Sequence, residues 1–155
     1  QCVSGTRVVQ FDRRQRRRID AAAVREKFGV PPESIPDYLA LVGDSADGYP
    51  GIPGWGAKTA ATLLARFGHI EAIPENARKW NVQVRAADRL AKTLSEQREL
   101  ALLFKRLATL VTDGPVHNKV DDLKWSGPGT GFAKICERLE NPGLLKRAKD
   151  LAGRI

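Results

Sequence analysis

The chain has few of the residues that build metal-thiolate centres or disulfide frameworks. Among its 155 residues are two cysteines, Cys2 and Cys136, and two histidines, with no Cys-x-x-Cys pair and no histidine cluster. A zinc centre of the usual ligand spacing is therefore not expected. A chain of this length also needs no disulfide to fold. We expect both thiols to be free in a reducing compartment, which favours a cytoplasmic location.

Long apolar runs are also lacking. No stretch approaches the roughly 20 apolar residues that cross a bilayer as a helix, and no secretory leader is visible, so we expect no membrane partner. The chain starts with Gln1 rather than methionine, and its first residues have the pattern of a strand. We therefore expect it to be a fragment of a longer protein.

Positive charge is abundant. Lysine and arginine number 26 against 18 acidic residues, a formal net charge of +8, while 42% of the residues are hydrophobic. The apolar share is enough for a folded core. The charge balance suits a polyanionic partner such as nucleic acid, although an inert basic surface would have the same composition.

The periodicity predicts a mainly α fold after a short N-terminal β-hairpin. The runs 1–3 and 7–11, separated by Ser4-Gly5, are expected to form that β-hairpin or the last strands of an upstream sheet. Five arginines lie within residues 13–18, in a solvated turn or a phosphate-facing patch. Helices are expected over residues 21–28, 35–42, 57–67, 82–94, 96–110, 131–139 and 144–152.

Local signals add detail to this prediction. Asp20 and Gly29 are expected to cap the first helix, and Ser34 with Asp37 to form a capping box for the second. In the helix over 96–110, the apolar spacing predicts that one face turns toward the core, with Leu100, Leu103, Phe104 and Leu107. A second helix-face prediction concerns basic residues: Arg85, Arg89 and Lys92 are spaced to share one face.

A glycine-rich turn joins the helices over 35–42 and 57–67. Residues 51–58 are Gly-Ile-Pro-Gly-Trp-Gly-Ala-Lys, here named the glycine hairpin. Gly54 and Gly56 allow a phosphate to approach the free amides at the start of the next helix, where the helix dipole is positive. Lys58, in the first turn, opposes that dipole unless an anion lies between them, and Thr59 adds a hydroxyl. Ile52 and Trp55 are expected mainly to pack into the core.

Residues 53–58 resemble the helix-hairpin-helix family, whose core is an apolar residue, Gly, an apolar residue, Gly, any residue and Lys. The resemblance implies contact with the DNA backbone without sequence preference. It also implies a K⁺ or Na⁺ ion held by hairpin carbonyls. On this basis the DNA-binding candidates are Gly51, Ile52, Gly54, Trp55, Gly56, Ala57, Lys58 and Thr59, within a motif that spans residues 35–67.

Two aspartates precede the glycine hairpin. Asp44 and Asp47 lie in a glycine loop, and no lysine or arginine stands between Asp37 and Lys58 to neutralise them. A bound cation would do so, and oxygen ligands suit Mg²⁺ or Mn²⁺. The same spacing is also common in turns, and two carboxylates do not complete a two-metal site.

Residues 37–60 closely resemble the bacterial 5′-3′ exonucleases of the flap-endonuclease superfamily, with both aspartates, the Pro-Gly pairs and Lys58-Thr59-Ala60 in step. The resemblance implies metal-dependent hydrolysis of DNA phosphodiesters, with Asp44 and Asp47 as catalytic ligands of the second metal. It implies that residues 1–18 are the last strands of an upstream α/β nuclease core. Residues 19–155 would then form a helical DNA-binding subdomain. The first-metal carboxylates would lie upstream, so the isolated chain is expected to be inactive.

Three functional hypotheses follow. The first is a 5′ nuclease acting on duplex or flapped DNA, monomeric, with an upstream core and in some parents a downstream polymerase domain. The second is a non-catalytic helix-hairpin-helix module in which the aspartates only shape a turn. The third, an RNA-binding helical domain, is disfavoured because the chain has no RNP-like aromatic motif and no KH loop.

Overall fold

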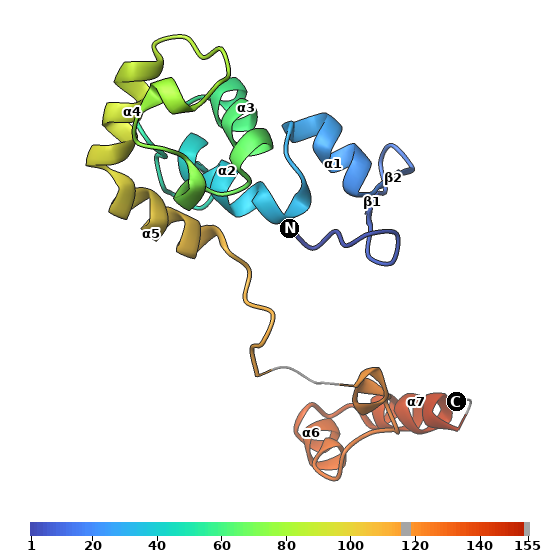
Figure 1. Cartoon of the computed structure of the whole chain (residues 1–155). Helices are drawn as coiled ribbons and strands as arrows, with labels where there is room; N and C mark the ends of the chain where they lie inside the picture. Colours follow the sequence, from blue (N-terminus) through green and yellow to red (C-terminus); the bar gives the residue numbers. More distant parts are fainter. Residues whose placement is uncertain (116–118, 154–155) are drawn as a thin grey trace. The chain divides into compact units, whose positions relative to one another are not determined.

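The computed structural model describes residues 1–115 and 119–153. The chain separates into two compact units, Gln1–Val111 and Thr112–Ile155, and each is described by itself. Most of the ordered elements are helices (Figure 1), so the mainly α fold is confirmed. The sequence-based boundary between residues 18 and 19 stays a prediction, whereas the separation after Val111 was not anticipated from the sequence.

The first unit begins with a two-stranded antiparallel β-hairpin. Strand β1 (Gln10–Asp12) pairs with β2 (Arg17–Ile19), and Gln10 lies opposite Ile19. The turn between them is held by Asp12, whose Oδ1 accepts hydrogen bonds from the amides of Arg14 and Gln15 at 2.9 and 3.0 Å. The arginine run therefore forms the tip and the second strand of this β-hairpin.

Of the two alternatives for the N-terminal runs, the β-hairpin of residues 1–3 and 7–11 is wrong, because the turn at Ser4-Gly5 closes only an isolated bridge between Ser4 and Val8. The other alternative, that these runs are the last strands of an upstream sheet, stays a prediction. The paired strands come later because the carboxylate of Asp12 can cap a turn of its own. The first part of the arginine run therefore forms a turn, which is one of the two alternatives that its sequence offered.

Three helices of the first unit match their predicted bounds: α1 (Ala21–Phe28), α2 (Ile35–Val42) and α3 (Ala57–Phe67). Local caps explain the first of them. Asp20 Oδ1 accepts from the amide of Ala23 at 3.1 Å, and Gly29 ends the helix in the left-handed conformation. Gly68 ends α3 with its amide bonded to the carbonyl of Leu64.

The two following helices differ from prediction. Helix α4 runs over Ala87–Glu96 and α5 over Arg98–Ala108, instead of 82–94 and 96–110. Asn81 and Ala86 adopt positive φ angles of 50° and 57°, which excludes the segment between them from α4. Ser95 lies inside α4 rather than capping α5, and Gln97 is the junction.

The predicted core face of α5 is also mostly wrong. Ala101, Phe104 and Ala108 are buried, while the leucines at 100, 103 and 107 are 39%, 49% and 63% exposed. Helix α2 packs between α3 and α5 (Figure 1), and two of the three residues that α5 buries are alanines. The rotation of α5 about its axis is thus set by its partner helix, since both faces offer apolar residues.

Asp37 connects three segments of the first unit. Its side chain is fully buried; Oδ1 accepts from the amide of Ile70 and from Lys105 Nζ, both at 2.9 Å, and Oδ2 lies 2.9 Å from His69 Nδ1. The predicted capping box is therefore wrong: Ser34 makes no side-chain cap bond, and Asp37 is committed to tertiary contacts. A buried carboxylate needs such partners, and these outweighed the local cap.

Lys105 extends this contact to Glu71, whose Oε2 lies 2.8 Å from Nζ. Burial by itself lowers the pKa of Lys105, but the hydrogen bonds to Glu71 and Asp37 outweigh it and the pKa is raised above 10.5. For Glu71, burial is the largest single effect and raises the pKa, but the hydrogen bonds from Lys105 and the backbone, together with the charges of Lys105 and His69, outweigh it, so the net pKa is lowered. The charged forms of both groups are thus favoured at neutral pH.

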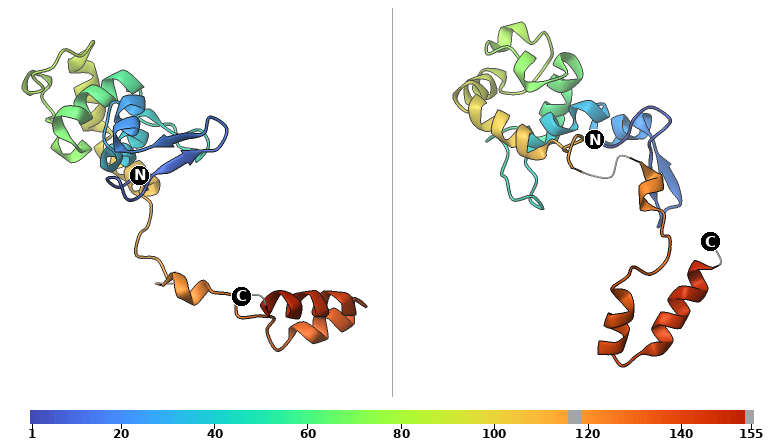
Figure 2. Two further views of the ribbon diagram at one scale, coloured as in Figure 1. Left: turned by 90° about the vertical axis from the view of Figure 1, so that its right-hand side faces the viewer. Right: turned by 90° about the horizontal axis from the view of Figure 1, so that it is seen from below.

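The second unit contains a 3₁₀ turn (Val120–Leu123) and two helices, α6 (Phe132–Arg138) and α7 (Pro142–Ala152). Both helices are within two residues of prediction. They pack on each other, as both views of Figure 2 show. Asn141 caps α7 through a hydrogen bond from the amide of Leu144 to its Oδ1 at 3.2 Å.

The buried ion pair yields a stability prediction. We expect Lys105→Met to lower the free energy of unfolding by about 3 kcal/mol or more, because Asp37 would keep a buried charge without its cation. The matched control is Lys92→Met, which removes the same charge from an exposed pair with Glu96 at 3.8 Å and should cost less than about 1 kcal/mol. Urea unfolding at pH 7 measures both; equal losses would contradict the prediction.

Candidate nucleic-acid interface

The glycine hairpin is joined to α2 through backbone contacts. The amide of Ile52 donates to the carbonyl of Leu41 at 2.9 Å. A Cβ atom on Gly51 would lie 2.4 Å from the nitrogen of Gly43, and one on Gly43 would lie 2.6 Å from the carbonyl of Pro50. Both glycines also have positive φ, 91° at Gly43 and 74° at Gly51. Only glycine permits this direct backbone-to-backbone approach.

Trp55 fixes the other side of the glycine hairpin. Its side chain is 4% exposed, its Nε1 donates to the carbonyl of Leu90 on α4 at 3.3 Å, and its ring meets that of Trp80 edge-on at 6.1 Å. Trp80 is fully buried and donates its own Nε1 to the carbonyl of Pro74 at 2.7 Å. The expectation that Trp55 serves the core rather than stacking on bases agrees with this packing.

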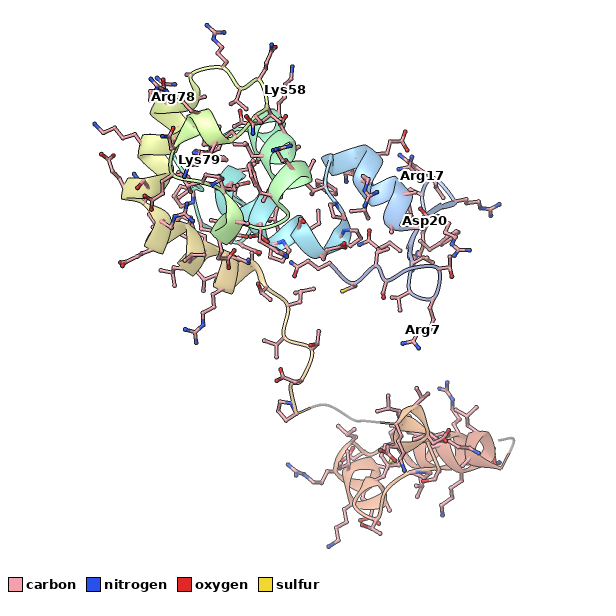
Figure 3. The ribbon with its side chains drawn as sticks, viewed as in Figure 1. Arg7, Arg17, Asp20, Lys58, Arg78 and Lys79 are labelled. Carbon is pink, nitrogen blue, oxygen red and sulfur yellow. The ribbon has the colours of Figure 1, made fainter. Side chains whose placement is uncertain are left out.

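The amides at the start of α3 have no protein acceptor within the described residues. Gly56 precedes the helix in extended conformation and offers no side-chain cap, and the first amide that closes a helical bond is that of Ala60, to the carbonyl of Gly56. The amides of Ala57, Lys58 and Thr59 therefore point outward unpaired, at the positive end of the dipole. Lys58 adds an exposed ammonium group to this end, as Figure 3 shows.

The structure divides the predicted DNA-binding residues into two groups. The exposed or half-exposed group, which offers amides and a cation to solvent, comprises Gly54, Gly56, Ala57, Lys58 and Thr59. The buried group comprises Gly51, Ile52 and Trp55. Any contact with an anion falls to the first group, whereas the second holds the hairpin in place.

The predicted catalytic aspartates lie in a tight loop of residues 44–49, here named the aspartate loop. Asp44 and Tyr49 exchange backbone hydrogen bonds of 3.0 and 3.2 Å, and Asp44 Oδ1 accepts from the amide of Ala46 at 2.9 Å. Asp44 is half-buried and lines a surface hollow with Tyr49, while Asp47 is exposed at the loop tip. One carboxylate oxygen of Asp44 thus shapes the turn, and the other accepts no hydrogen bond from the described residues.

The pKa of the Tyr49 hydroxyl depends on the charge of the aspartate loop. Its hydroxyl is buried without a hydrogen-bond partner in the described part of the chain, and its ring stacks on Phe104 at 5.5 Å. Burial raises the pKa of the Tyr49 hydroxyl, and the negative charges of Asp44 and Asp47 raise it further. Both aspartates are therefore near enough to this hydroxyl to act on it electrostatically.

The aspartates fit only part of a metal site. Neither has a lysine, arginine or histidine partner in the described residues, so their charge is uncompensated. Their hard oxygens match Mg²⁺ or Mn²⁺. However, no group of three or more potential ligands occurs among residues 1–115 and 119–153. Asp44 and Asp47 alone therefore do not make a complete metal site among the described residues.

The basic residues do not form one continuous track. Arg85 lies before the start of α4, so the predicted helix face shared with Arg89 and Lys92 is wrong for it. The N-terminal arginines belong to the β-hairpin, where Arg18 also donates to the carbonyl of Thr6. In Figure 3, Arg7 and Arg17 lie there, away from Lys58.

Comparison with known proteins agrees with this geometry. The family model described as "5′-3′ exonuclease, C-terminal SAM fold" matches residues 30–130, more than half of the chain. The chain belongs to this family. The matched segment includes the aspartate loop, the glycine hairpin and helices α2 to α5, so the 5′-3′ exonuclease C-terminal family accounts for the elements that form the candidate interface.

The proteins that are similar to this chain in sequence have the names of nucleases or polymerases. The chain is 37% identical to DNA polymerase I of Bacillus caldotenax over 149 residues, covering 86% of this chain and 16% of the relative. It is 40% identical to a 5′-3′ exonuclease of Aquifex aeolicus, covering 79% and 40%. With the flap endonuclease Xni of Edwardsiella ictaluri it shares 38%, covering 73% and 42%. The chain thus spans less than half the length of these relatives.

No helix in the described part of the structure is long and apolar enough to cross a membrane.

The glycine contact gives a second stability prediction. We expect Gly51→Ala to cost about 3 kcal/mol or more, since its Cβ would meet backbone at 2.4 Å and the position has positive φ. Gly48→Ala is the matched control: its φ is 83°, but no atom lies within 4 Å of the added Cβ. It should cost only about 1–2 kcal/mol of conformational strain. Thermal unfolding of both variants measures the two losses of stability. Similar losses would contradict a close contact between Gly51 and the backbone of Gly43.

Proposed function

We propose that this chain is the DNA-binding part of a metal-dependent 5′-3′ exonuclease or flap endonuclease. It holds duplex DNA by its sugar-phosphate backbone through the start of α3. The observation that carries the proposal is the uncapped α3 terminus, where the amides of residues 57–59 have no acceptor in the described residues and the Lys58 side chain is exposed. The family assignment and the names of the relatives support it.

The chemistry of this terminus suits phosphate and not base edges. Main-chain amides and one flexible ammonium group form hydrogen bonds and ion pairs with a phosphate oxygen, and all nucleotides present the same oxygens. Gly54 and Gly56 have no side chain that would hold a sugar-phosphate strand away. Binding without sequence preference follows, and it weakens as salt rises.

The substitution Lys58→Ala tests the proposed binding of the DNA backbone at the start of α3. Loss of one phosphate contact should weaken binding to unrelated duplexes about equally and lower the slope of log K against log salt by about one. The control is Arg66→Ala, which removes a charge from the last turn of the same helix. Fluorescence anisotropy at several salt concentrations measures both. Sequence-selective loss, or equal effects of the two variants, would contradict the backbone grip.

We further propose that Asp44 and Asp47 bind one divalent ion, Mg²⁺ or Mn²⁺, in the complete enzyme. The second carboxylate oxygen of Asp44, which has no hydrogen-bond partner in the described residues, and the exposed carboxylate of Asp47 are available to do so. The ion supplies positive charge that stabilises phosphodiester hydrolysis. The chain itself fixes where that charge lies, because the Gly43–Gly51 contact joins the aspartate loop to the glycine hairpin. A K⁺ ion at the hairpin carbonyls belongs to the same proposal and rests on the family resemblance.

The metal assignment predicts that Asp44→Asn in the intact nuclease abolishes cleavage of a 5′-flap substrate and leaves duplex affinity nearly unchanged. The amide retains the turn but supplies a much weaker metal ligand. Asp150→Asn, at an exposed site on α7, should cleave like the wild type. Normal cleavage by the Asp44 variant would refute the assignment.

The second candidate is a non-catalytic helix-hairpin-helix module. The observation in its favour is that no group of three or more potential metal ligands occurs in the described residues, so Asp44 and Asp47 have no third protein ligand there. It predicts that Mg²⁺ or Mn²⁺ titration gives no response that depends on Asp44 and Asp47. For the parent protein, we propose a cytoplasmic monomer with an upstream nuclease core. A downstream polymerase domain, as the name of the Bacillus relative indicates for that protein, is one possible arrangement.

A further inference from the structure

Helix α4 lies directly against the turn of the glycine hairpin. A Cβ atom on Gly54 would be 3.3 Å from Leu90 Cδ2 and 4.0 Å from Arg89 Nη2. The hydrogen bond from the Trp55 indole to the carbonyl of Leu90 holds this part of α4 in place. The guanidinium group of Arg89 is therefore positioned beside the exposed turn that precedes α3.

Arg89 is the basic residue of α4 that lies beside the glycine hairpin and has no acidic partner in the described residues. Lys92 is paired with Glu96 on the next turn of α4 and lines a hollow with Glu75 and Asp88. Arg85 lies outside the helix. By contrast, Arg89 is exposed, and in the part of the chain that the structure describes its side chain takes part in no ion pair and no hydrogen bond.

We infer that Arg89 is a second phosphate-binding residue, which contacts the DNA backbone beside the phosphate held by Lys58 and the α3 amides. This inference rests on the proposed function. A guanidinium group presents a planar set of donors that matches two oxygens of one phosphate. Gly54 gives it room, because any side chain at that position would project toward Leu90 and Arg89.

Two contacts would do more than one. A strand held only at the start of α3 can pivot about that phosphate, whereas a second contact from α4 fixes the direction in which the backbone crosses the hairpin. Arg89 and the α3 terminus come from different helices. Their relative position is set by Trp55, which is anchored in the core between them.

The experiment compares Arg89→Ala, Arg89→Gln and Arg89→Lys with Lys92→Ala, using the intact chain and a short DNA duplex. We expect the Ala and Gln variants to bind about tenfold more weakly, as for loss of a charge-assisted hydrogen bond, with a salt slope lower by about one. The Lys variant should keep the slope and recover only part of the affinity, since it lacks the planar donor set. Lys92→Ala should change affinity less than twofold.

The outcomes separate this inference from the function it rests on. If Lys58→Ala weakens binding while Arg89→Ala behaves like Lys92→Ala, Arg89 is a solvated residue and the inference fails alone. If no variant, Lys58→Ala included, alters binding, the backbone grip itself fails. A purely structural role for Arg89 would lower the melting temperature in the Ala variant and would be restored by Gln, so wild-type binding by Arg89→Gln also overturns the inference.

Discussion

The carboxylate of Asp37 holds together the part of the fold on which the candidate interface depends. It is fully buried at the start of α2 and receives Lys105 from α5 and both His69 and the Ile70 amide from the segment after α3. An unpaired charge at this depth would be strongly unfavourable, so these contacts hold the three segments together. The C-terminal end of the same helix leads straight into the aspartate loop, whose position therefore depends on this contact.

The glycine hairpin combines rigid support with an open surface. Ile52 and Trp55 fill the core beneath it, while the residues that face solvent are those with little or no side chain, together with Lys58. Such a division suits recognition of a backbone whose shape is constant but whose bases vary, because complementarity then comes from fixed amides and not from adaptable side chains. The indole of Trp55 supports both helices that border the turn, so α3 and α4 present their polar groups in a constant relation.

The helices α1, α2 and α3 could be predicted to the residue because their ends carry local signals, such as Asp20, Gly29 and Gly68. The start of α4 could not, since the left-handed Ala86 has no signature in its side chain. Which face of α5 is buried depends on its packing against α2. For that reason the face with Ala101 and Ala108 is buried, and the leucine-rich face is exposed. For the site, the resemblance pointed to the aspartate loop and the glycine hairpin, and the roles of their residues stay predictions. The role of Asp37 and the position of Arg89 depend on contacts between segments distant in sequence, which spacing alone does not show.

The contact between Gly43 and Gly51 has a consequence for how this region can vary among related proteins. Because the two backbones touch, the residues between them form a closed lobe whose base is fixed while its tip, at Gly48, is surrounded by open space. Substitutions at the tip can therefore accumulate without moving the glycine hairpin, and insertions there would project outward. The surroundings of Asp44 and Asp47 can therefore change without a change in the glycine hairpin. The two carboxylates and the start of α3 are in this way adjacent in sequence yet separately open to selection.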